Sequence, residues 1–305
     1  MTRILFVKTS SLGDVVHNCP AVSDAARALP GAAIDWVVEE PFAGIAAMHP
    51  AVRRVIPVAV RRWRGALWKP AVWSEIGAWR RNLAAEAYDA VVDTQSLFKS
   101  ALISRAASGR RHGLDRASAR EWLAPLFYDV RHAVPRGLHA VERNRRLTAS
   151  ALGFGLETPL EYGLRVPGGE KSGYVVLLTM TSRADKLWPE ERWMELGRGL
   201  RAPTVLPWGS EEERARAERI AAAIGGTLPP RRNLEELARL FVSARGVVGL
   251  DTGLTHLAAA LGAPTVGIYC GSDPTLTGIY GAPQAKNLGA SGRPPTAADV
   301  LQLLE

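Results

Sequence analysis

An acidic side chain follows the first apolar run of the sequence, at the point where a helix is expected to begin. The run Ile4–Val7 predicts a short buried strand, and the segment Lys8–Asp14 comes directly after it with the sequence KTSSLGD. Aspartate is a preferred residue for capping a helix, so Asp14 fits a purely structural role. A carboxylate in a loop after a strand can equally act as a general base toward a substrate hydroxyl. The spacing allows both interpretations.

The segment Lys8–Asp14 lacks the glycine patterns that hold common nucleotide cofactors. It has neither the Walker spacing nor the pattern G-x-G-x-x-G, so we expect no dinucleotide cofactor. The two cysteines, Cys19 and Cys270, are far apart, and the sequence has no C-x-x-C motif or His/Cys cluster. We therefore expect neither a zinc site nor a disulfide framework, which favours a reducing compartment.

A loop in the second half of the sequence combines hydroxyl groups with a lysine. The segment Thr181–Glu190 follows an apolar run and places Thr181 and Ser182 ahead of Lys186, with Pro189 opening a helix. Such a loop can hold a diphosphate, with the ammonium group of Lys186 stabilising the leaving group. A capped loop between a strand and a helix has the same composition, so this motif taken alone leaves both interpretations open.

A second segment in this half has the features of an anion site at a helix start. An apolar run ends at Asp251 and a helix is predicted at once, so the backbone N–H groups of Thr252, Gly253 and Leu254 point out of its first turn. His256 follows one turn later. A lone histidine is usually a packed side chain, but this one follows a turn of the phosphate-binding type, and we favour a binding role.

A run of glutamates follows another predicted strand at Pro207–Arg214, which reads PWGSEEER. A glutamate in this run, Glu211 or Glu212, can accept hydrogen bonds from ribose hydroxyls. Acidic residues are also favourable in the first turn of any helix, because the helix dipole is positive there, and most of the run fits that role.

Basic residues are concentrated in the first half. Arg61–Arg64 reads RRWR, Trp68 and Lys69 follow it, and Gly109–Arg120 adds further arginines. We expect both stretches to lie largely in loops. Arginine binds carboxylates and phosphates through two N–H groups at once, so these stretches predict a clamp for an acidic ligand, with a solvated basic surface as the alternative.

The charge balance also indicates an anionic partner. Lysine and arginine number 38 against 30 acidic residues, which gives a net charge of +8. Nucleic acid, a phosphorylated substrate and an anionic membrane all satisfy this balance. Aromatic residues between basic ones also occur in nucleic-acid binders, but no fold signature of such proteins accompanies them, so we expect no nucleic-acid partner.

Strand-like and helix-like segments alternate along the whole chain, which predicts an α/β protein with parallel sheets and helices on both faces. The predicted strands are Ile4–Val7, Ile34–Val38, Val55–Val58, Ala90–Asp93, Tyr174–Leu178, Thr204–Leu206, Gly246–Leu250 and Thr265–Tyr269. The predicted helices include Val15–Leu29, Glu75–Ala87, Leu97–Ala107, Glu211–Ala223, Leu234–Ser243 and Leu254–Leu261.

The alternation pauses at Leu156–Gly173, where prolines and glycines suit a linker between domains. We therefore expect two domains, residues 1–160 and 161–305, each doubly wound and separated by an interdomain cleft. Ligands of such sheets bind beyond the carboxyl ends of the strands, which is where the candidate motifs lie.

The hydropathy of the sequence indicates where in the cell the protein is located. No apolar stretch approaches the roughly 18 residues needed to span a bilayer, and no signal peptide is visible at the first residues. We expect a cytoplasmic protein that is soluble or rests on a membrane surface.

Taken together, these motifs resemble the lipopolysaccharide heptosyltransferases, and the resemblance runs over essentially the whole chain. The DTG-x-x-H segment marks the broader family, and the KTSSLGD form of the first loop indicates the heptosyltransferase I branch. The similar segments are Lys8–His17, Arg61–Arg64, Thr181–Glu190, Pro207–Arg214 and Asp251–Tyr269.

The resemblance implies a GT-B fold, with two Rossmann-like domains and a cleft between them. It implies inverting transfer of L-glycero-D-manno-heptose from ADP-heptose to the Kdo residue of Kdo-lipid A in lipopolysaccharide inner-core biosynthesis. ADP-heptose is then a substrate, and neither a cofactor nor a metal is expected. A later-acting heptosyltransferase and a non-catalytic nucleotide-sugar binding module are the alternatives.

The resemblance also assigns residues and a location. Asp14 matches the family's proposed catalytic base. The implied donor-binding residues are Thr181, Ser182, Lys186, Glu211, Asp251, Thr252, Gly253 and His256. The implied acceptor-binding residues are Ser10, Ser11, Gly13, Arg61, Arg64 and Arg120. The 1–160 domain would bind the acceptor and the 161–305 domain the ADP-sugar, with the protein peripheral on the cytoplasmic face of the inner membrane.

Overall fold

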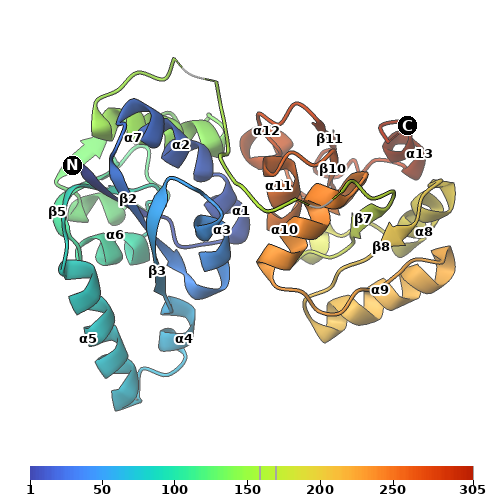
Figure 1. Ribbon diagram of the computed structural model, residues 1–305, viewed down its shortest axis with the longest axis horizontal. Helices are drawn as coiled ribbons and strands as arrows, with labels where there is room; N and C mark the ends of the chain where they lie inside the picture. The colour runs from blue at the N-terminus through green and yellow to red at the C-terminus, as the bar shows by residue number, and fades with distance from the viewer. Residues whose placement is uncertain (158, 169, 305) are drawn as a thin grey trace. The chain divides into compact units, whose positions relative to one another are not determined.

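The computed structural model describes residues 1–157, 159–168 and 170–304 and divides the chain into two compact units. The N-terminal unit is Met1–Leu164 and the C-terminal unit is Arg165–Glu305 (Figure 1). The division therefore falls slightly later than the 160/161 boundary expected from the sequence. Within the described ranges, no helix is both long and apolar enough to cross a membrane.

The N-terminal unit is built on a parallel sheet whose strand order is β3-β2-β1-β4-β5-β6. This is the doubly wound order, in which the direction of winding reverses between β1 and β4. Both faces of β1 and β2 are buried, as expected for parallel strands that helices cover on two sides. The strands are β1 (Arg3–Val7), β2 (Ala33–Glu39), β3 (Val52–Val58), β4 (Ala87–Asp93), β5 (Ser108–Leu114) and β6 (Val130–His132).

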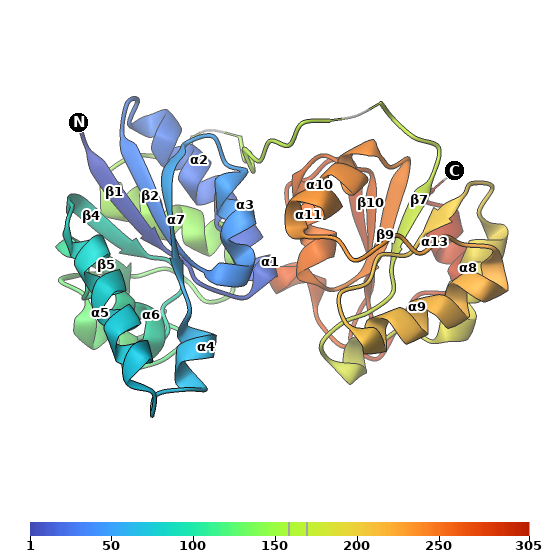
Figure 2. The same cartoon turned by 60° about the horizontal axis from the view of Figure 1, so that its bottom comes forward.

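Helices cover both faces of this sheet (Figure 2). Val72 and Leu83 of α5 and Ile103 of α6 pack with strand residues in one buried apolar cluster. On the opposite face, α2 packs against α7. The helices are α1 (Leu12–Val16), α2 (Cys19–Ala28), α3 (Ala43–Ala47), α4 (Val60–Arg64), α5 (Pro70–Ala84), α6 (Phe98–Ser104) and α7 (Ala140–Leu152), with short 3₁₀ turns η1 (Glu40–Phe42) and η2 (Ala124–Phe127).

The single helix predicted over Val15–Leu29 is wrong, because the structure has two helices there, α1 and α2. The backbone carbonyl of His17 accepts a hydrogen bond from the Asn144 side chain, 3.0 Å away, so it is engaged outside the helix. Pro20 lies in the first turn of α2, where its missing N–H costs nothing. Because of this break, Asp14 lies on a separate short helix, α1.

The basic stretches were also predicted incorrectly. Arg61–Arg64 is not a loop but most of α4, which is anchored by Trp63, a buried residue whose ring lies 6.0 Å from that of Trp79. Gly109–Arg120 does not lie largely in loops, because its first half belongs to strand β5. The charged residues misled the prediction there, since the first residues of β5 are exposed at the amino end of the strand.

The C-terminal unit has a second parallel sheet with the order β11-β10-β9-β7-β8. Its strands are β7 (Val175–Leu178), β8 (Thr204–Val205), β9 (Gly246–Leu250), β10 (Thr265–Tyr269) and β11 (Ala285–Gly289). Its helices are α8 (Glu190–Gly199), α9 (Glu211–Ile224), α10 (Leu234–Ser243), α11 (Gly253–Ala260), α12 (Pro274–Thr277) and α13 (Ala297–Leu301), with the 3₁₀ turn η3 (Ala184–Lys186). The predicted α/β architecture with two parallel sheets is thus confirmed.

The core of this unit lies between the sheet and α8, α9 and α13, and α10 and α11 cover the other face (Figure 2). Trp188 and Trp193 are fully buried there, with ring centroids 5.0 Å apart. Local sequence signals mark where these helices begin and end. Gly225 ends α9 with a φ of 69°, a conformation that favours glycine, and Asn233 with Glu236 forms a capping box at the start of α10.

Candidate functional site

The candidate residues of each unit gather at the carboxyl edge of its sheet. Because all strands of a unit are parallel, the loops that follow them leave from the same edge. In the N-terminal unit, Asp14 comes after β1, Arg61 after β3 and Arg120 after β5. In the C-terminal unit, Lys186 comes after β7 and Asp251 after β9.

Asp14 is the third residue of α1 and is partly exposed. Its carboxylate accepts a hydrogen bond from the backbone N–H of Ser11 at 3.0 Å and lies 3.4 Å from the guanidinium of Arg120. The structure thus brings the predicted base together with two predicted acceptor-binding residues. Gly13 lies one residue earlier on α1, where its backbone carbonyl accepts from His17.

Lys99 is a residue of this edge that sequence reasoning missed. Its ammonium group donates a hydrogen bond to the Oγ of Ser10 at 2.7 Å. Burial lowers the pKa of Lys99, the carboxylates of Glu39 and Asp14 raise it, and the guanidinium groups of Arg61 and Arg64 lower it further. These charged groups therefore all lie within electrostatic reach of Lys99. The only sequence signal was the place of Lys99 near the carboxyl end of β4.

Gln95 holds the first loop in place. Its side-chain oxygen accepts hydrogen bonds from the backbone N–H of Thr9 at 2.6 Å and from the Thr9 hydroxyl at 2.9 Å. Its amide group donates to the carbonyl of Ser10. Gln95 is buried and follows β4, the neighbour of β1, so the loop that carries Asp14 is fixed by the adjacent strand.

A second anchor of the loop is Lys8, whose ammonium group is buried. It donates to the carbonyl of Thr94 at 2.9 Å and to Oδ1 of Asn144 at 3.3 Å. Burial lowers the pKa of Lys8 to about 8, although the charge of Asp14 acts in the opposite direction. A buried amine of this kind titrates close to neutral pH and near the candidate base.

Two of the three arginines of α4, Arg61 and Arg64, are the predicted acceptor-binding residues, and both are exposed at the same edge. The backbone N–H of Arg61 donates to Oε1 of the buried Glu39 at 2.7 Å, which ties the start of α4 to the end of β2. The Arg61 guanidinium lies 5.4 Å above the ring of Phe42. Arg64 is exposed at the end of α4. Both side chains are placed to meet an acidic ligand.

In the C-terminal unit, Asp251 is the centre of a compact polar cluster. Its carboxylate lies 2.6 Å from the ammonium of Lys186 and 3.3 Å from Nε2 of His256, and it accepts from the Ser272 hydroxyl at 2.5 Å. Burial by itself raises the pKa of Asp251, but the hydrogen bonds from His256, Lys186 and Ser272 outweigh burial and hold the pKa well below its usual range. Asp251 is therefore a stable anion that positions a cation.

Ser272 was missed because it comes from the loop after β10. That loop approaches the Lys186 loop so closely that a Cβ on Gly271 would lie 2.4 Å from the carbonyl oxygen of Asp185. Only glycine fits at this contact, and the contact brings Ser272 to Asp251. A strand order with β10 beside β9 is required for this arrangement.

The start of α11 has the expected helix-cap geometry. Thr252 is the N-cap residue and Gly253 is the first residue of the helix. The Thr252 and Thr255 hydroxyl oxygens are 3.2 Å apart, and the Thr255 hydroxyl donates to the carbonyl of Leu250 at 2.6 Å. The first N–H groups of a helix have no partner within it, so this turn offers donors to an anion.

The Asp251 cluster, as defined by the contacts above, does not include the remaining donor-site candidates. Thr181 and Ser182 lie in the loop between β7 and η3, half-buried and exposed respectively. Glu211 is the first residue of α9, largely exposed, and 3.6 Å from Arg214. All three follow strands of the same sheet edge, and their proposed roles stay predictions.

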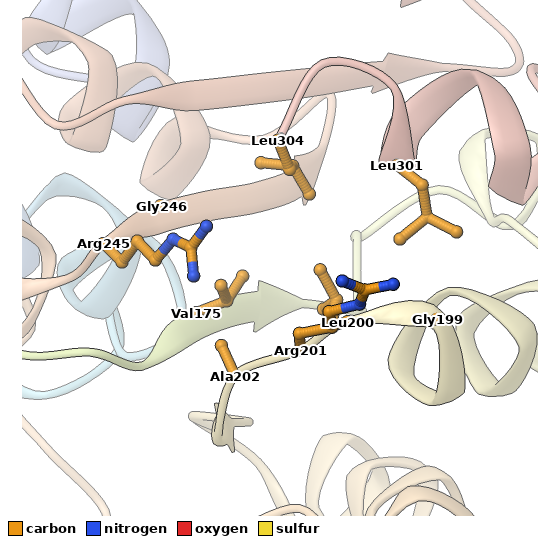
Figure 3. Close-up of a pocket in the computed structure, with 9 residues that line it drawn as sticks. All are labelled: Val175, Gly199, Leu200, Arg201, Ala202, Arg245, Gly246, Leu301 and Leu304. Carbon is orange, nitrogen blue, oxygen red and sulfur yellow. The ribbon is translucent and has the colours of Figure 1, made fainter.

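A separate cavity lies at the opposite edge of the C-terminal sheet (Figure 3). Val175 and Gly246, which begin β7 and β9, contribute to its wall, as do Arg201 and Arg245. It has a volume of about 390 Å³. Because it adjoins the amino ends of the strands, it is not part of the Asp251 cluster. Among the described residues, no group of three or more His, Cys, Asp or Glu side chains is arranged to hold a metal ion.

Comparison with known proteins identifies the family to which these features belong. The family model of glycosyltransferase family 9 (heptosyltransferase) matches residues 76–299. Lipopolysaccharide heptosyltransferase 1 of Salmonella typhimurium is 46% identical over 297 residues, which covers 92% of each chain.

Comparison with solved structures indicates the same family. The E. coli heptosyltransferase WaaC with ADP has a TM-score of 0.93 and 43% identity, with 99% of each chain covered. The same enzyme with ADP-2-deoxy-2-fluoro heptose has a TM-score of 0.90 and 42% identity, again over 99% of each chain. The resemblance inferred from the motifs is thus confirmed: the chain is a glycosyltransferase with the GT-B fold and belongs to glycosyltransferase family 9, the heptosyltransferases.

Proposed function

We propose that the protein transfers L-glycero-D-manno-heptose from ADP-heptose to the Kdo residue of Kdo-lipid A, with inversion at the anomeric carbon. The observation that carries this proposal is the cluster of Lys186, Asp251 and His256 at the start of α11, which suits a diphosphate. Support also comes from the relative named lipopolysaccharide heptosyltransferase 1 and from the WaaC structures with ADP and with an ADP-heptose analogue.

The C-terminal unit would bind the donor. An ammonium group has three N–H donors, so Lys186 can hold Asp251 and still donate to a phosphate oxygen. The backbone N–H groups at Thr252 and Gly253 would donate hydrogen bonds to the second phosphate. The other donor-binding residues that we propose are Thr181, Ser182, Asp251, His256 and, for the ribose, Glu211.

The N-terminal unit would bind the acceptor. Kdo carries a carboxylate and lipid A carries phosphates, which are the groups that arginine binds best. Arg61, Arg64 and Arg120 supply guanidinium groups at the same sheet edge as Asp14. Ser10, Ser11 and Gly13 would line the loop beside the reacting hydroxyl.

In the proposed reaction, the acceptor hydroxyl oxygen attacks the anomeric carbon of the heptose from the face opposite the diphosphate. Asp14 takes the hydroxyl proton while the bond between the anomeric carbon and the phosphate oxygen breaks. The electron pair of that bond leaves with ADP, and Lys186 with the N–H groups of α11 stabilises the developing charge. Each such donor can lower the barrier by roughly 2.7–4 kcal/mol.

We propose that no cofactor and no metal ion take part in the chemistry, because Lys186 and a helix start can offset the charge of the leaving diphosphate. Turnover should therefore persist in EDTA. We also propose that the protein works at the cytoplasmic face of the inner membrane as a peripheral protein. Its net charge of +8 supports contact with anionic lipid headgroups, each nearby basic residue contributing about 1 kcal/mol.

A coupled assay that reads ADP release from ADP-heptose tests the proposal. ADP should appear only when Kdo-lipid A is present. Release that needs an acceptor already carrying a heptose would indicate a later-acting heptosyltransferase. Binding of ADP without release on any acceptor would indicate a nucleotide-sugar binding module instead.

A further inference from the structure

Large apolar side chains lie exposed along one edge of the N-terminal unit. Six of them follow the carboxyl ends of β3, β4 and β5, of which β4 and β5 are neighbours and β3 is the edge strand on the other side of the sheet. Single exposed apolar residues are ordinary, but a group of large ones on one edge marks an interaction surface. These six are Leu67, Trp68, Trp73, Phe98, Trp122 and Leu126.

Three of them form the aromatic tip, which we define as Leu67, Trp68 and Trp73, at the connection between α4 and α5 and in the first turn of α5. Trp68 is 75% exposed and Trp73 is 59% exposed. Figures 1 and 2 both show α4 and α5 projecting beyond the sheet, with their connection at the far end. The indole N–H of Trp73 donates to the carbonyl of Leu67 at 2.8 Å, so the tip has a defined shape.

The aromatic tip is surrounded by positive charge. The helices and connection from Val60 to Ala84 contain six basic residues against one acidic residue, Glu75. Glu75 is already paired with Arg62, and Lys69 stands exposed beside Trp68. Tryptophan beside lysine and arginine is the composition of a surface that enters the headgroup region of an anionic bilayer, because the indole is apolar with one polar N–H.

The helix that leads into the aromatic tip, α4, carries two of the proposed acceptor-binding arginines. Arg61 and Arg64 belong to α4, and Trp68 follows four residues after Arg64. If the acceptor is a glycolipid, its acidic sugar would meet α4 while its bilayer meets the adjacent aromatic tip. This step rests on the proposed function, whereas the exposure and charge of the tip do not.

We propose that the aromatic tip is a membrane-docking element, in which Trp68 and its neighbours enter the headgroup region of an anionic lipid bilayer. Docking there would hold α4 close to the bilayer surface. The basic residues between Val60 and Ala84 would add an attraction to the lipid headgroups that salt screens, whereas the contribution of the aromatic side chains would persist at high salt.

Vesicle sedimentation tests this proposal with the full chain and no donor or acceptor. Vesicles of phosphatidylethanolamine with phosphatidylglycerol are compared with vesicles of phosphatidylcholine alone. Trp68→Ala should bind the anionic vesicles about tenfold more weakly than the parent chain, since burial of a large aromatic side chain is lost. Leu67→Ala and Leu303→Ala are a matched pair, 43% and 42% exposed, and only the first should weaken binding.

Turnover with a water-soluble acceptor that lacks acyl chains separates docking from acceptor binding. Trp68→Ala should keep this turnover within about twofold while losing turnover on vesicle-embedded acceptor. Unchanged vesicle binding by Trp68→Ala, or equal losses in Leu67→Ala and Leu303→Ala, would overturn the proposal. A loss on the soluble acceptor would also overturn it, because the tip would then belong to the acceptor site. Since the vesicle assay contains no substrates, its failure would leave the proposed function standing.

Discussion

The guanidinium of Arg120 lies 3.4 Å from the carboxylate of Asp14, although the two residues are 106 positions apart in the sequence. Asp14 follows β1 and Arg120 follows β5, so the contact exists only because the parallel sheet gathers its loops at one edge. Arginine has five N–H donors in a planar fork, and a single contact with Asp14 leaves others for an acidic ligand. We therefore propose that Arg120 holds the acceptor beside the proposed base.

Replacing Arg120 should weaken the acceptor and spare the donor. Arg120→Ala removes charge-assisted hydrogen bonds worth roughly 1.5–3 kcal/mol, so kcat/KM for the acceptor should fall about 10- to 100-fold. Steady-state kinetics with each substrate varied in turn measures this. Arg110→Ala, an exposed arginine in the first half of β5, is the control and should change little. A fall confined to the donor would contradict the assignment.

Gln95 should act as a positioning residue for the Asp14 loop. Gln95→Leu leaves the Thr9 N–H and the Ser10 carbonyl without their partner, at a cost of about 1–3 kcal/mol in the free energy of unfolding. We expect kcat to fall while the affinity for ADP, measured by calorimetry, stays constant. Gln284→Leu, which alters a glutamine of the C-terminal unit, should leave kcat alone. Equal effects of the two variants would mean that Gln95 only supports stability.

Lys186 should serve donor binding and the chemical step together. Lys186→Ala removes a cation from the diphosphate, so kcat should fall roughly 10²- to 10³-fold and ADP affinity should fall as well. Lys171→Ala is the control, because Lys171 is an exposed lysine of the same unit that donates to the Val242 carbonyl. If Lys186→Ala changed acceptor affinity alone, the roles assigned to the two units would be reversed.

Lys8 should give the pH–rate profile an alkaline limb. Its pKa is lowered to about 8, so above that pH the amine is neutral and its charge no longer acts on Asp14 and the loop. We expect kcat/KM to decline above pH 8 in the parent chain, and Lys8→Met to lack that decline. A decline of the same midpoint in Lys8→Met would assign it to another group.

Deprotonation of Lys8 does not destabilise the fold, so unfolding does not account for such a decline in kcat/KM. Between pH 8 and the ordinary lysine value of 10.5, the folded chain binds fewer protons at Lys8 than the unfolded chain. The contribution of Lys8 to the free energy of unfolding therefore rises with pH across this window. Thermal unfolding measured over the same pH range checks that the chain remains folded where activity falls.

Much of the C-terminal unit follows from local signals in the sequence. Gly246–Leu250, Thr265–Tyr269 and Leu234–Ser243 have the bounds that were predicted for them, because apolar β-rich runs and a capping box mark them. The rule that ligands meet the carboxyl ends of parallel strands also selected Lys186 and Asp251, which the structure brings within 2.6 Å.

The residues that were missed depend on strand order, which no local pattern carries. Gln95 reaches Thr9 because β4 lies beside β1, and Ser272 reaches Asp251 because β10 lies beside β9. Lys99 was missed for the same reason. The sequence placed it in a predicted helix, and no local pattern showed that its side chain meets Ser10. The break between α1 and α2 depends on packing as well, because the Asn144 side chain of α7 donates a hydrogen bond to the backbone carbonyl of His17 there.

The most direct test of the proposed chemistry is the turnover of Asp14→Ala with ADP-heptose and Kdo-lipid A, measured beside its affinity for ADP. Loss of the general base should lower kcat about 10²- to 10⁴-fold, while the dissociation constant for ADP stays within about twofold of the parent value. Turnover equal to that of the parent chain would contradict the account and remove Asp14 from the mechanism.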